Sequence, residues 1–141
     1  YITDSAKLFT PVYNEEKRYY QMRQKFNDSE DIYERAVYFL YLNRHGYNGL
    51  CRYNNSGKFN VPFGRYKAPY FPEKEIVYFA EKSQLATFTC DSFEKVFSRA
   101  RKGSVIYCDP PYAPISKTAM FNSYATGGFT LDNQIKLASL A

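Results

Sequence analysis

The sequence predicts an α/β fold in which part of a parallel sheet carries a helical region with a β-hairpin. Apolar residues recur at helical spacing between residues 14 and 42, and turn-forming residues are dense between residues 46 and 72. Further along, two apolar segments, residues 86–90 and 104–108, flank a helical pattern, and an aspartate follows each of them. Strand, helix and strand in this order are typical of a parallel sheet, which binds ligands beyond the carboxyl ends of its strands.

Length and composition place the chain among globular proteins. Its 141 residues are enough for one domain with its own core, and contents of 45% hydrophobic and 23% charged residues argue against disorder. The chain begins with Tyr1 rather than Met and ends at Ala141 inside an expected helix, so we expect a piece of a longer protein. No apolar run approaches membrane-spanning length, and no secretion signal is visible.

Positive charge is concentrated in one stretch of the chain. The net charge is +5, and residues 44–72 contain no Asp or Glu. The basic residues of this stretch are Arg44, Arg52, Lys58, Arg65 and Lys67, with His45 beside the first of them. Positive charge without counter-charge attracts a polyanion, and the tyrosines interleaved with it offer flat surfaces for stacking on bases. This stretch therefore predicts a nucleic-acid partner.

The three cysteines, Cys51, Cys90 and Cys108, are far apart and lack the spacing of a metal site. Together with the single His of the chain, they argue against a zinc site and against a disulfide framework. We expect no metal, no membrane partner and a reducing, cytoplasmic compartment.

Two amphipathic helices are expected before the turn-rich stretch. The first spans residues 14–26, with acidic residues in its first turn and an apolar stripe formed by Tyr19, Met22 and Phe26. Residues 27–31, Asn-Asp-Ser-Glu-Asp, offer a cap for the second helix, which continues to about Leu42. Its predicted apolar stripe consists of Ile32, Ala36, Phe39 and Leu40.

A basic, aromatic β-hairpin is expected after these helices. Asn-Gly, Asn-Asn-Ser-Gly and Pro-Phe-Gly segments rule out a long helix here. Residues 50–53 and 58–61 are expected to pair across the Asn-Asn-Ser-Gly turn at residues 54–57.

The second half of the chain carries the strand and helix pattern. Residues 75–79 indicate a short strand or the start of a helix around residues 79–83, and residues 86–90 alternate like a strand. A helix is expected over residues 92–100, followed by a buried strand at 104–108. Thr130 is expected to cap a final helix that starts at Leu131.

The segment Val-Ile-Tyr-Cys-Asp-Pro-Pro-Tyr, residues 105–112, carries the most specific chemical signal. The exocyclic amine of a nucleobase is a poor nucleophile, so its alkylation needs acceptors that hold and orient the N–H groups. We assign Asp109 as one acceptor and the carbonyl of Pro110 as a second, with Pro111 fixing the backbone. Tyr112 would stack on a base turned out of the duplex.

The chain resembles the Dam-type DNA adenine-N6 methyltransferases, the D12 class of N6 adenine-specific enzymes, which methylate adenine in GATC. The resemblance rests on FLYLNRHGYNGLCRYN at residues 39–54, GKFNVPFGRYKAPYFP at 57–72 and the D-P-P-Y motif at 109–112. It implies methyl transfer from S-adenosylmethionine to a flipped-out adenine in double-stranded DNA, on part of a Rossmann-like methyltransferase sheet. It also implies a target-recognition region over residues 10–75, with a hairpin at about 47–66, and a partial catalytic domain over residues 76–141.

The resemblance also implies roles for individual residues. Tyr47 would insert into the base stack, and Asn48 would help to fill the gap. Base edges would be contacted by Leu50, Arg52 and Pro62, with Arg52 the candidate for a guanine contact in the major groove. Phosphates would be contacted by Arg23, Asn54, Asn60, Arg65 and Lys67. Cofactor contacts would come from Asp91 with Phe93 nearby, and from Asp109. Asp91 could equally be a helix N-cap.

The sequence departs from the family pattern at the cofactor site. The family's N-terminal Gly-Gly-Lys segment, its F-x-G-x-G loop and its ribose-binding acid are absent, so the main S-adenosylmethionine motif lies outside this chain. We therefore expect little or no activity from the chain alone, and its unpaired sheet edges favour self-association. A bacterial or phage enzyme acting in the cytoplasm is the resulting expectation.

Two other functions remain open from the residues alone. One is a non-catalytic module that binds nucleic acid through the basic, aromatic hairpin. The other is an amine methyltransferase that acts on RNA, on cytosine N4 or on a protein side-chain amide.

Overall fold

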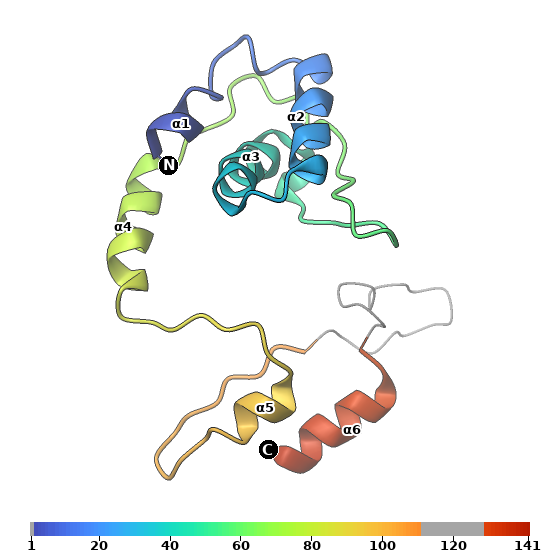
Figure 1. Cartoon of the computed structure of the whole chain (residues 1–141), viewed down its shortest axis with the longest axis vertical. Coiled ribbons are helices and arrows are strands. Elements are labelled where there is room, and N and C mark those ends of the chain that lie inside the picture. The colour runs from blue at the N-terminus through green and yellow to red at the C-terminus, as the bar shows by residue number, and fades with distance from the viewer. Residues whose placement is uncertain (1, 111–128) are drawn as a thin grey trace. The chain divides into compact units, whose positions relative to one another are not determined.

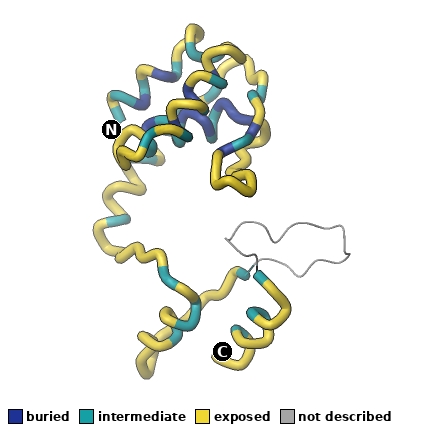
Figure 2. The backbone as a smooth tube through the Cα atoms, turned by 45° about the vertical axis from the view of Figure 1, so that its right-hand side comes forward, coloured by how far each residue is buried: buried dark blue, intermediate teal, exposed yellow. Residues whose placement is uncertain are grey.

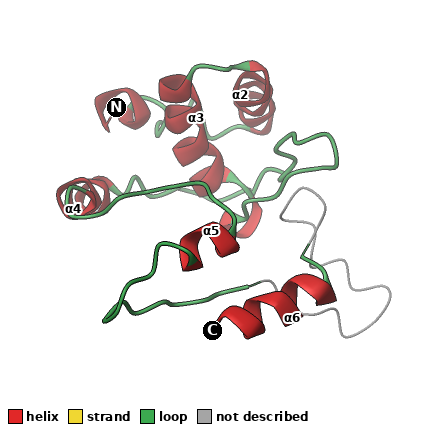
Figure 3. Cartoon of the chain, turned by 60° about the horizontal axis from the view of Figure 1, so that its bottom comes forward, coloured by secondary structure: helices red, strands yellow, loops and turns green. Residues whose placement is uncertain are grey.

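The computed structural model describes residues 2–110 and 129–141. Over these ranges the chain is helical, with loops between the helices and no assigned strand (Figures 1 and 3). In chain order the elements are α1 (Ile2–Ala6), α2 (Glu16–Asp28), α3 (Ile32–His45), the 3-10 helix η1 (Tyr47–Gly49), α4 (Glu73–Ser83), α5 (Phe93–Phe97) and α6 (Leu131–Leu140). The chain divides into unit 1, Tyr1–Ala86, and unit 2, Thr87–Ala141.

Helix α2 forms where the spacing of apolar residues predicted it. Tyr19, Met22 and Phe26 are buried on one face of the helix, which confirms the predicted stripe. Glu16 lies in the first turn and Lys25 in the last, so both charges favour the helix dipole. This face of α2 packs against α3.

Helix α3 is capped as predicted, but its buried face differs from the predicted one. The Asp31 side chain accepts a hydrogen bond of 2.8 Å from the backbone N–H of Glu34. The buried residues are Val37, Tyr41, Leu42 and His45. Ile32 is 85% exposed, so its place in the predicted stripe was wrong. The contacts of α3 with α1, α2 and η1 bury its C-terminal half and leave its first turn in solvent.

The core of unit 1 is rich in aromatic side chains and joins distant parts of the sequence. Figure 2 marks the buried positions in dark blue. Phe59 and Val61, which lie outside the helices, are 1% and 0% exposed, and the Phe59 ring meets Phe26 edge to face at 5.7 Å. Each such buried side chain contributes about 1.5–3 kcal/mol relative to its exposed state. Unit 2, in contrast, has no buried residue over 87–110 and 129–141.

Residues 46–64 run out and back, but not as a continuous β-hairpin. Two isolated antiparallel bridges join the two arms, Gly46 with Phe63 and Tyr53 with Phe59. The second bridge lies between the two segments that were expected to pair. Between the bridges, η1 places Asn48 and Gly49 at φ values of 52° and 62°. This left-handed backbone breaks the extended conformation that a strand ladder needs.

Two expected strands and one ambiguous segment take other forms. Residues 75–79 lie inside α4, which settles that segment as helix. Residues 86–90 and 104–108 are loop, and no described residue pairs with them as a strand neighbour (Figure 3). An isolated extended segment has no ladder of hydrogen bonds, so it is not a strand by itself. The helix expected over residues 92–100 is shorter, Phe93–Phe97.

The last helix begins where its cap predicted. The Thr130 side chain accepts a 3.2 Å hydrogen bond from the backbone N–H of Asn133, and α6 starts at Leu131. Within unit 2, α6 lies beside α5, and Lys136 forms a 2.8 Å ion pair with Glu94.

His45 is a buried titratable group in the core of unit 1. It is 1% exposed, its Nδ1 lies 3.0 Å from the carbonyl oxygen of Tyr41, and the rings of Tyr41 and Phe9 pack on it. Burial lowers its pKa from 6.5 to about 4, because the charged imidazolium would lose its hydration. The imidazole is therefore neutral near pH 7.

We expect the free energy of unfolding to fall as the pH is lowered from 6.5 to 4. Over this window the unfolded chain binds a proton at residue 45 and the folded chain does not, so protonation favours unfolding. The full loss is on the order of 3 kcal/mol. His45→Gln should remove this part of the pH dependence, as measured by urea unfolding at a series of pH values. Identical pH profiles for the two proteins would contradict the assignment.

Candidate functional site

The basic loop, residues 46–67, carries most of the predicted DNA-contacting residues and lies over α2 and α3. Its two arms are joined near the helices by the Tyr47 N–H, which donates to the Pro62 carbonyl at 2.9 Å. The second arm is also attached to the end of α3, because the Gly64 N–H donates to the His45 carbonyl at 2.8 Å. Near its tip, the Asn54 N–H donates to the Lys58 carbonyl at 2.9 Å. The loop is therefore closed by backbone bonds at both ends, although it lacks a continuous ladder.

Arg52, the predicted guanine-contacting residue, is exposed and is held by one neighbour across the loop. Its Nε donates to Asn60 Oδ1 at 2.8 Å, and its Nη2 donates to the Asn60 carbonyl at 3.2 Å. The backbone repeats the connection, because Asn60 N–H donates to the Arg52 carbonyl at 3.0 Å. A guanidinium has five N–H donors, so several remain for a ligand.

The other predicted base-contacting residues are also exposed. Tyr47 is 50% exposed and Leu50 40%, and Pro62 is exposed on the opposite arm. Asn48 occupies the left-handed region, and its N–H donates to the Tyr66 hydroxyl at 2.9 Å. The structure therefore brings Tyr47, Asn48 and Pro62 together at the base of the loop, where the Tyr47 N–H contacts the Pro62 carbonyl.

The residues predicted to contact phosphates have different surroundings. Arg23 is half-buried, donates to the Val61 carbonyl at 2.9 Å and lies over the Tyr20 ring. The Asn54 side chain accepts from the backbone N–H groups of Ser56 and Lys58 and so closes the tip of the loop.

Arg65 and Lys67 are exposed on the second arm. Arg65 has a φ of 55° and lies 3.6 Å from the Glu16 carboxylate. Lys58 similarly lies 3.8 Å from Asp28. The stretch that lacks acids in the sequence thus gains two acidic neighbours from α2. Exposed ion pairs of this kind contribute about 0–1 kcal/mol, so a phosphate could displace them at low cost.

The predicted catalytic motif is described only in its first half. Asp109 is exposed and Pro110 is half-buried, at the end of the loop segment 104–108. Pro111 and Tyr112 lie outside the described residues. The Asp109 carboxylate is accessible to a ligand, as an acceptor of an amine proton must be.

Asp91 is held in place by two cations of unit 2. Its carboxylate lies 3.1 Å from Lys95 Nζ and 2.8 Å from Arg99 Nη2, and hydrogen bonds from these residues lower its pKa. The helix cap is the neighbouring residue, Ser92, whose side chain accepts from the Lys95 N–H, so the N-cap alternative for Asp91 was wrong. The predicted cofactor neighbour Phe93 meets the Phe129 ring edge to face at 6.0 Å.

One cavity of unit 2 is lined by residues other than those predicted to contact the cofactor. An open cavity of about 510 Å³ is lined by α5, the end of α6 and residues 104–108. Asp91, Phe93 and Asp109 are not among its lining residues. The Asp91 carboxylate is an acceptor of the kind that an adenine amine needs.

Two asparagines that organise the basic loop were not predicted from the sequence. Asn27 bonds both peptide groups of Phe59, and Asn14 Nδ2 donates to the Tyr66 carbonyl at 2.8 Å. Asn27 is in the last turn of α2, and Asn favours caps and turns over helix interiors. That preference was the available signal for Asn27.

Within residues 2–110 and 129–141, no three or more His, Cys, Asp or Glu side chains lie together where they could hold a metal ion. Nor is any helix within these ranges long and apolar enough to cross a membrane.

Comparison with known proteins gives a consistent result along the whole chain. The family model of the D12 class N6 adenine-specific DNA methyltransferases matches residues 1–141. The chain is 57% identical over 141 residues to the DNA adenine methylases of Salmonella typhi and of Escherichia coli K12, and 53% identical to that of Serratia marcescens. These alignments cover 100% of this chain and 51–52% of the relatives, so the chain spans about half of their length.

We expect Gly64→Ala to destabilise the basic loop. The new Cβ would lie 2.9 Å from the backbone oxygens of His45 and Gly46 and would press on the Tyr66 ring. Backbone oxygens cannot move aside easily, so overpacking should cost about 1–3 kcal/mol in the free energy of unfolding, measured with urea. Ser56→Ala, at the exposed tip of the same loop, is the control and should change stability by less than about 0.5 kcal/mol. Equal effects of both changes would contradict this packing.

Proposed function

This chain belongs to the D12 class N6 adenine-specific DNA methyltransferases, and from that membership we propose that it is the target-recognition and D-P-P-Y part of an enzyme that methylates adenine N6 in DNA. The main support for this proposal is the family match over all 141 residues. The matched range includes both the basic loop and the motif at 109–112. We propose GATC as the target sequence and S-adenosylmethionine as the methyl donor, whose pocket needs residues outside this chain.

In this proposal the basic loop contacts the duplex from the major groove. Arg52 presents its free N–H groups to a guanine, because guanine O6 and N7 form a pair of acceptors that matches a guanidinium. Tyr47 and Asn48 would enter the base stack, with Leu50 and Pro62 against base edges. The exposure of all five residues supports these roles.

Phosphate contacts would come mainly from the exposed cations Arg65 and Lys67. Asn54, Asn60 and Arg23 were predicted for the same task. We propose that the side chains of these three act on DNA mostly by shaping the loop, since each is hydrogen-bonded within the loop or to it.

At the motif, Asp109 and the Pro110 carbonyl would accept the two N–H groups of the adenine amine. This pairing turns the nitrogen lone pair out of conjugation with the ring and fixes its direction. Pro111 would hold the backbone, and Tyr112 would stack on the extruded base. Asp91 and Phe93 would contribute to the cofactor pocket.

The Rossmann-like sheet and the division of the chain into two regions are part of the same proposal. Residues 86–90 and 104–108 would become strands of a Rossmann-like sheet once neighbouring strands pair with them. Val105 and Tyr107 are 96% and 88% exposed, which supports an arrangement in which further protein covers them. On this basis residues 10–75 form the target-recognition region and residues 76–141 part of the catalytic domain.

We expect the 141-residue chain to bind a short duplex with one GATC more tightly than a duplex with one base pair of that sequence changed. The difference should be about 1–3 kcal/mol at moderate salt. Arg52→Lys should remove most of this preference, because it keeps the charge but loses the planar fork. Lys67→Ala is the control and should weaken binding to both duplexes equally. Equal affinities of the unaltered chain for the two duplexes would overturn the GATC assignment.

We expect Asp109→Ala, made in a full-length protein that contains this chain, to abolish methyl transfer while DNA affinity stays within about twofold. Removing one acceptor leaves the amine unoriented, an effect of about 10²-fold or more. Asp132→Ala, at the exposed start of α6, is the matched carboxylate control. Labelled-methyl transfer and filter binding measure the two effects. Full activity of Asp109→Ala would refute the role of Asp109 as an amine acceptor, whereas no methyl transfer by the unaltered full-length protein would favour a purely DNA-binding module.

A further inference from the structure

Helix α2 presents three polar side chains to one short segment of the basic loop. Tyr19, Arg23 and Asn27 are four residues apart, so they lie along one face of the helix. Tyr19 and Arg23 donate to the same acceptor, the Val61 carbonyl, at 3.0 and 2.9 Å. Asn27 bonds to Phe59, two residues earlier in the loop. Burial raises the pKa of Tyr19, so its hydroxyl keeps the proton that it donates.

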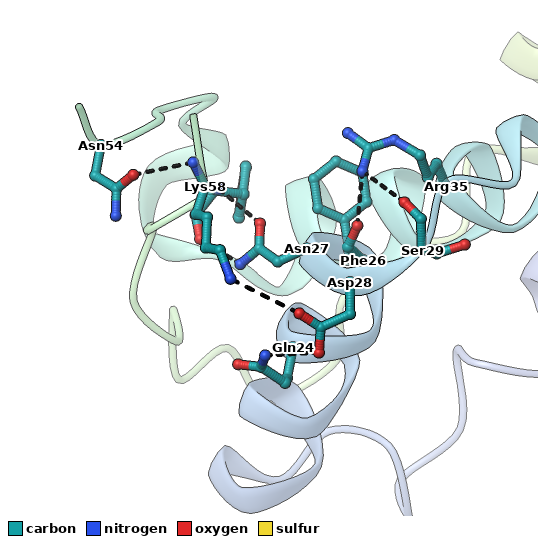
Figure 4. Close-up of polar contacts among 9 residues, drawn as sticks. Gln24, Phe26, Asn27, Asp28, Ser29, Arg35, Asn54 and Lys58 are labelled. Atoms are coloured by element: carbon teal, nitrogen blue, oxygen red, sulfur yellow. Dashed lines mark hydrogen bonds and ion pairs between the residues drawn. The ribbon is translucent and has the colours of Figure 1, made fainter. Parts of the chain in front are cut away.

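The Asn27 side chain binds the Phe59 backbone as a neighbouring strand would. Asn27 Nδ2 donates to the Phe59 carbonyl at 3.1 Å, and Asn27 Oδ1 accepts from the Phe59 N–H at 2.8 Å (Figure 4). Both atoms of the amide are used, and the Phe59 ring is locked in the core. The same view shows the adjacent Lys58 reaching Asp28, at 3.8 Å, on the last turn of α2. The Asn27 side chain of α2 therefore fixes the orientation of the Phe59 N–H and carbonyl groups.

Asn60 lies between these two fixed peptide groups. With Phe59 held by Asn27 and the Val61 carbonyl held by Tyr19 and Arg23, the backbone at residue 60 has little freedom. Its side chain and its carbonyl then both accept hydrogen bonds from Arg52. The position of Asn60 thus determines the position of the guanidinium.

The hydrogen bonds to Asn60 leave the outer edge of the guanidinium free. They occupy Nε and one N–H of Nη2, so Nη1 and the second N–H of Nη2 point away from Asn60. These are the two nitrogens that a parallel, end-on contact to guanine O6 and N7 needs. No acidic side chain in the described ranges forms an ion pair with Arg52.

We propose that Asn27 is a positioning residue: it orients the Arg52 guanidinium through Phe59 and Asn60, although it contacts neither Arg52 nor a ligand. The consequence for DNA rests on the function proposed above, in which Arg52 contacts guanine. Holding a long side chain in its bound direction before association lowers the entropy cost of binding and raises selectivity.

Nuclear magnetic resonance of the free 141-residue chain tests the positioning without DNA. The Nε–Hε signal of Arg52, identified by its loss in Arg52→Lys, reports on the bond to Asn60. In Asn27→Ala we expect the exchange of Hε with water to accelerate about fivefold or more. Gln24→Ala is the control, because Gln24 is exposed on the same helix and its side chain donates to Asp28 and not to the basic loop. Unchanged Hε exchange in a folded Asn27→Ala protein would overturn the proposal.

Asn27→Asp keeps the test decisive if the alanine variant does not fold. Its carboxylate still accepts from the Phe59 N–H but cannot donate to the Phe59 carbonyl, so Hε exchange should be faster than in the unaltered chain. Exchange equal to that of the unaltered chain would count against the proposal.

DNA binding then separates positioning from a general structural role. Asn27→Ala should lower the preference for the GATC duplex about fivefold or more and leave affinity for an unrelated duplex unchanged. In the double variant with Arg52→Lys, Asn27→Ala should cause no further loss of that preference. Equal weakening on both duplexes would overturn the positioning role. Altered Hε exchange in a chain whose unaltered form has no GATC preference would support the positioning of Arg52 and refute the proposed target.

Discussion

The backbone polar groups of residues 59–64 must find partners although no strand ladder runs beside them, and the organisation of unit 1 follows from this constraint. Phe59 and Val61 are buried, so their peptide groups cannot rely on water. Side chains of α2 supply the partners that a neighbouring strand would otherwise supply. An irregular loop is thereby attached to a helix face, and its exposed residues take defined positions.

Unit 2 carries residues proposed for chemistry but lacks a buried core among its described residues. It carries Asp109 and Asp91, yet no residue over 87–110 and 129–141 is buried. The apolar residues of 104–108, which were expected inside a sheet, are largely exposed. The chain spans about half the length of its relatives. Within it, we propose different tasks for the two units. The residues proposed for target recognition lie on the packed unit 1, and the residues proposed for catalysis lie in unit 2.

Local patterns in the sequence predicted the helices and their caps better than the pairing of extended segments. The stripe of α2 and the caps at Asp31 and Thr130 depend on residues within a few positions of one another, so they are visible in the sequence. The exposure of Ile32 depends on which end of α3 is covered. The form of 86–90 and 104–108 depends on strand neighbours, which no described residue supplies. Asn60 was predicted to contact phosphate, but its bonds to Arg52 across the loop could not be inferred from spacing.

Hydrogen–deuterium exchange of the whole chain, resolved to single amides, tests most directly the claim that α2 holds the basic loop. The account predicts that the amides of Phe59 and Gly64, which bond to Asn27 and to the His45 carbonyl, exchange as slowly as those in the middle of α2. Amides of residues 86–90 and 104–108 should exchange far faster. Fast exchange at Phe59 and Gly64 while α2 stays protected would contradict the account, because the loop would then move independently of the helix.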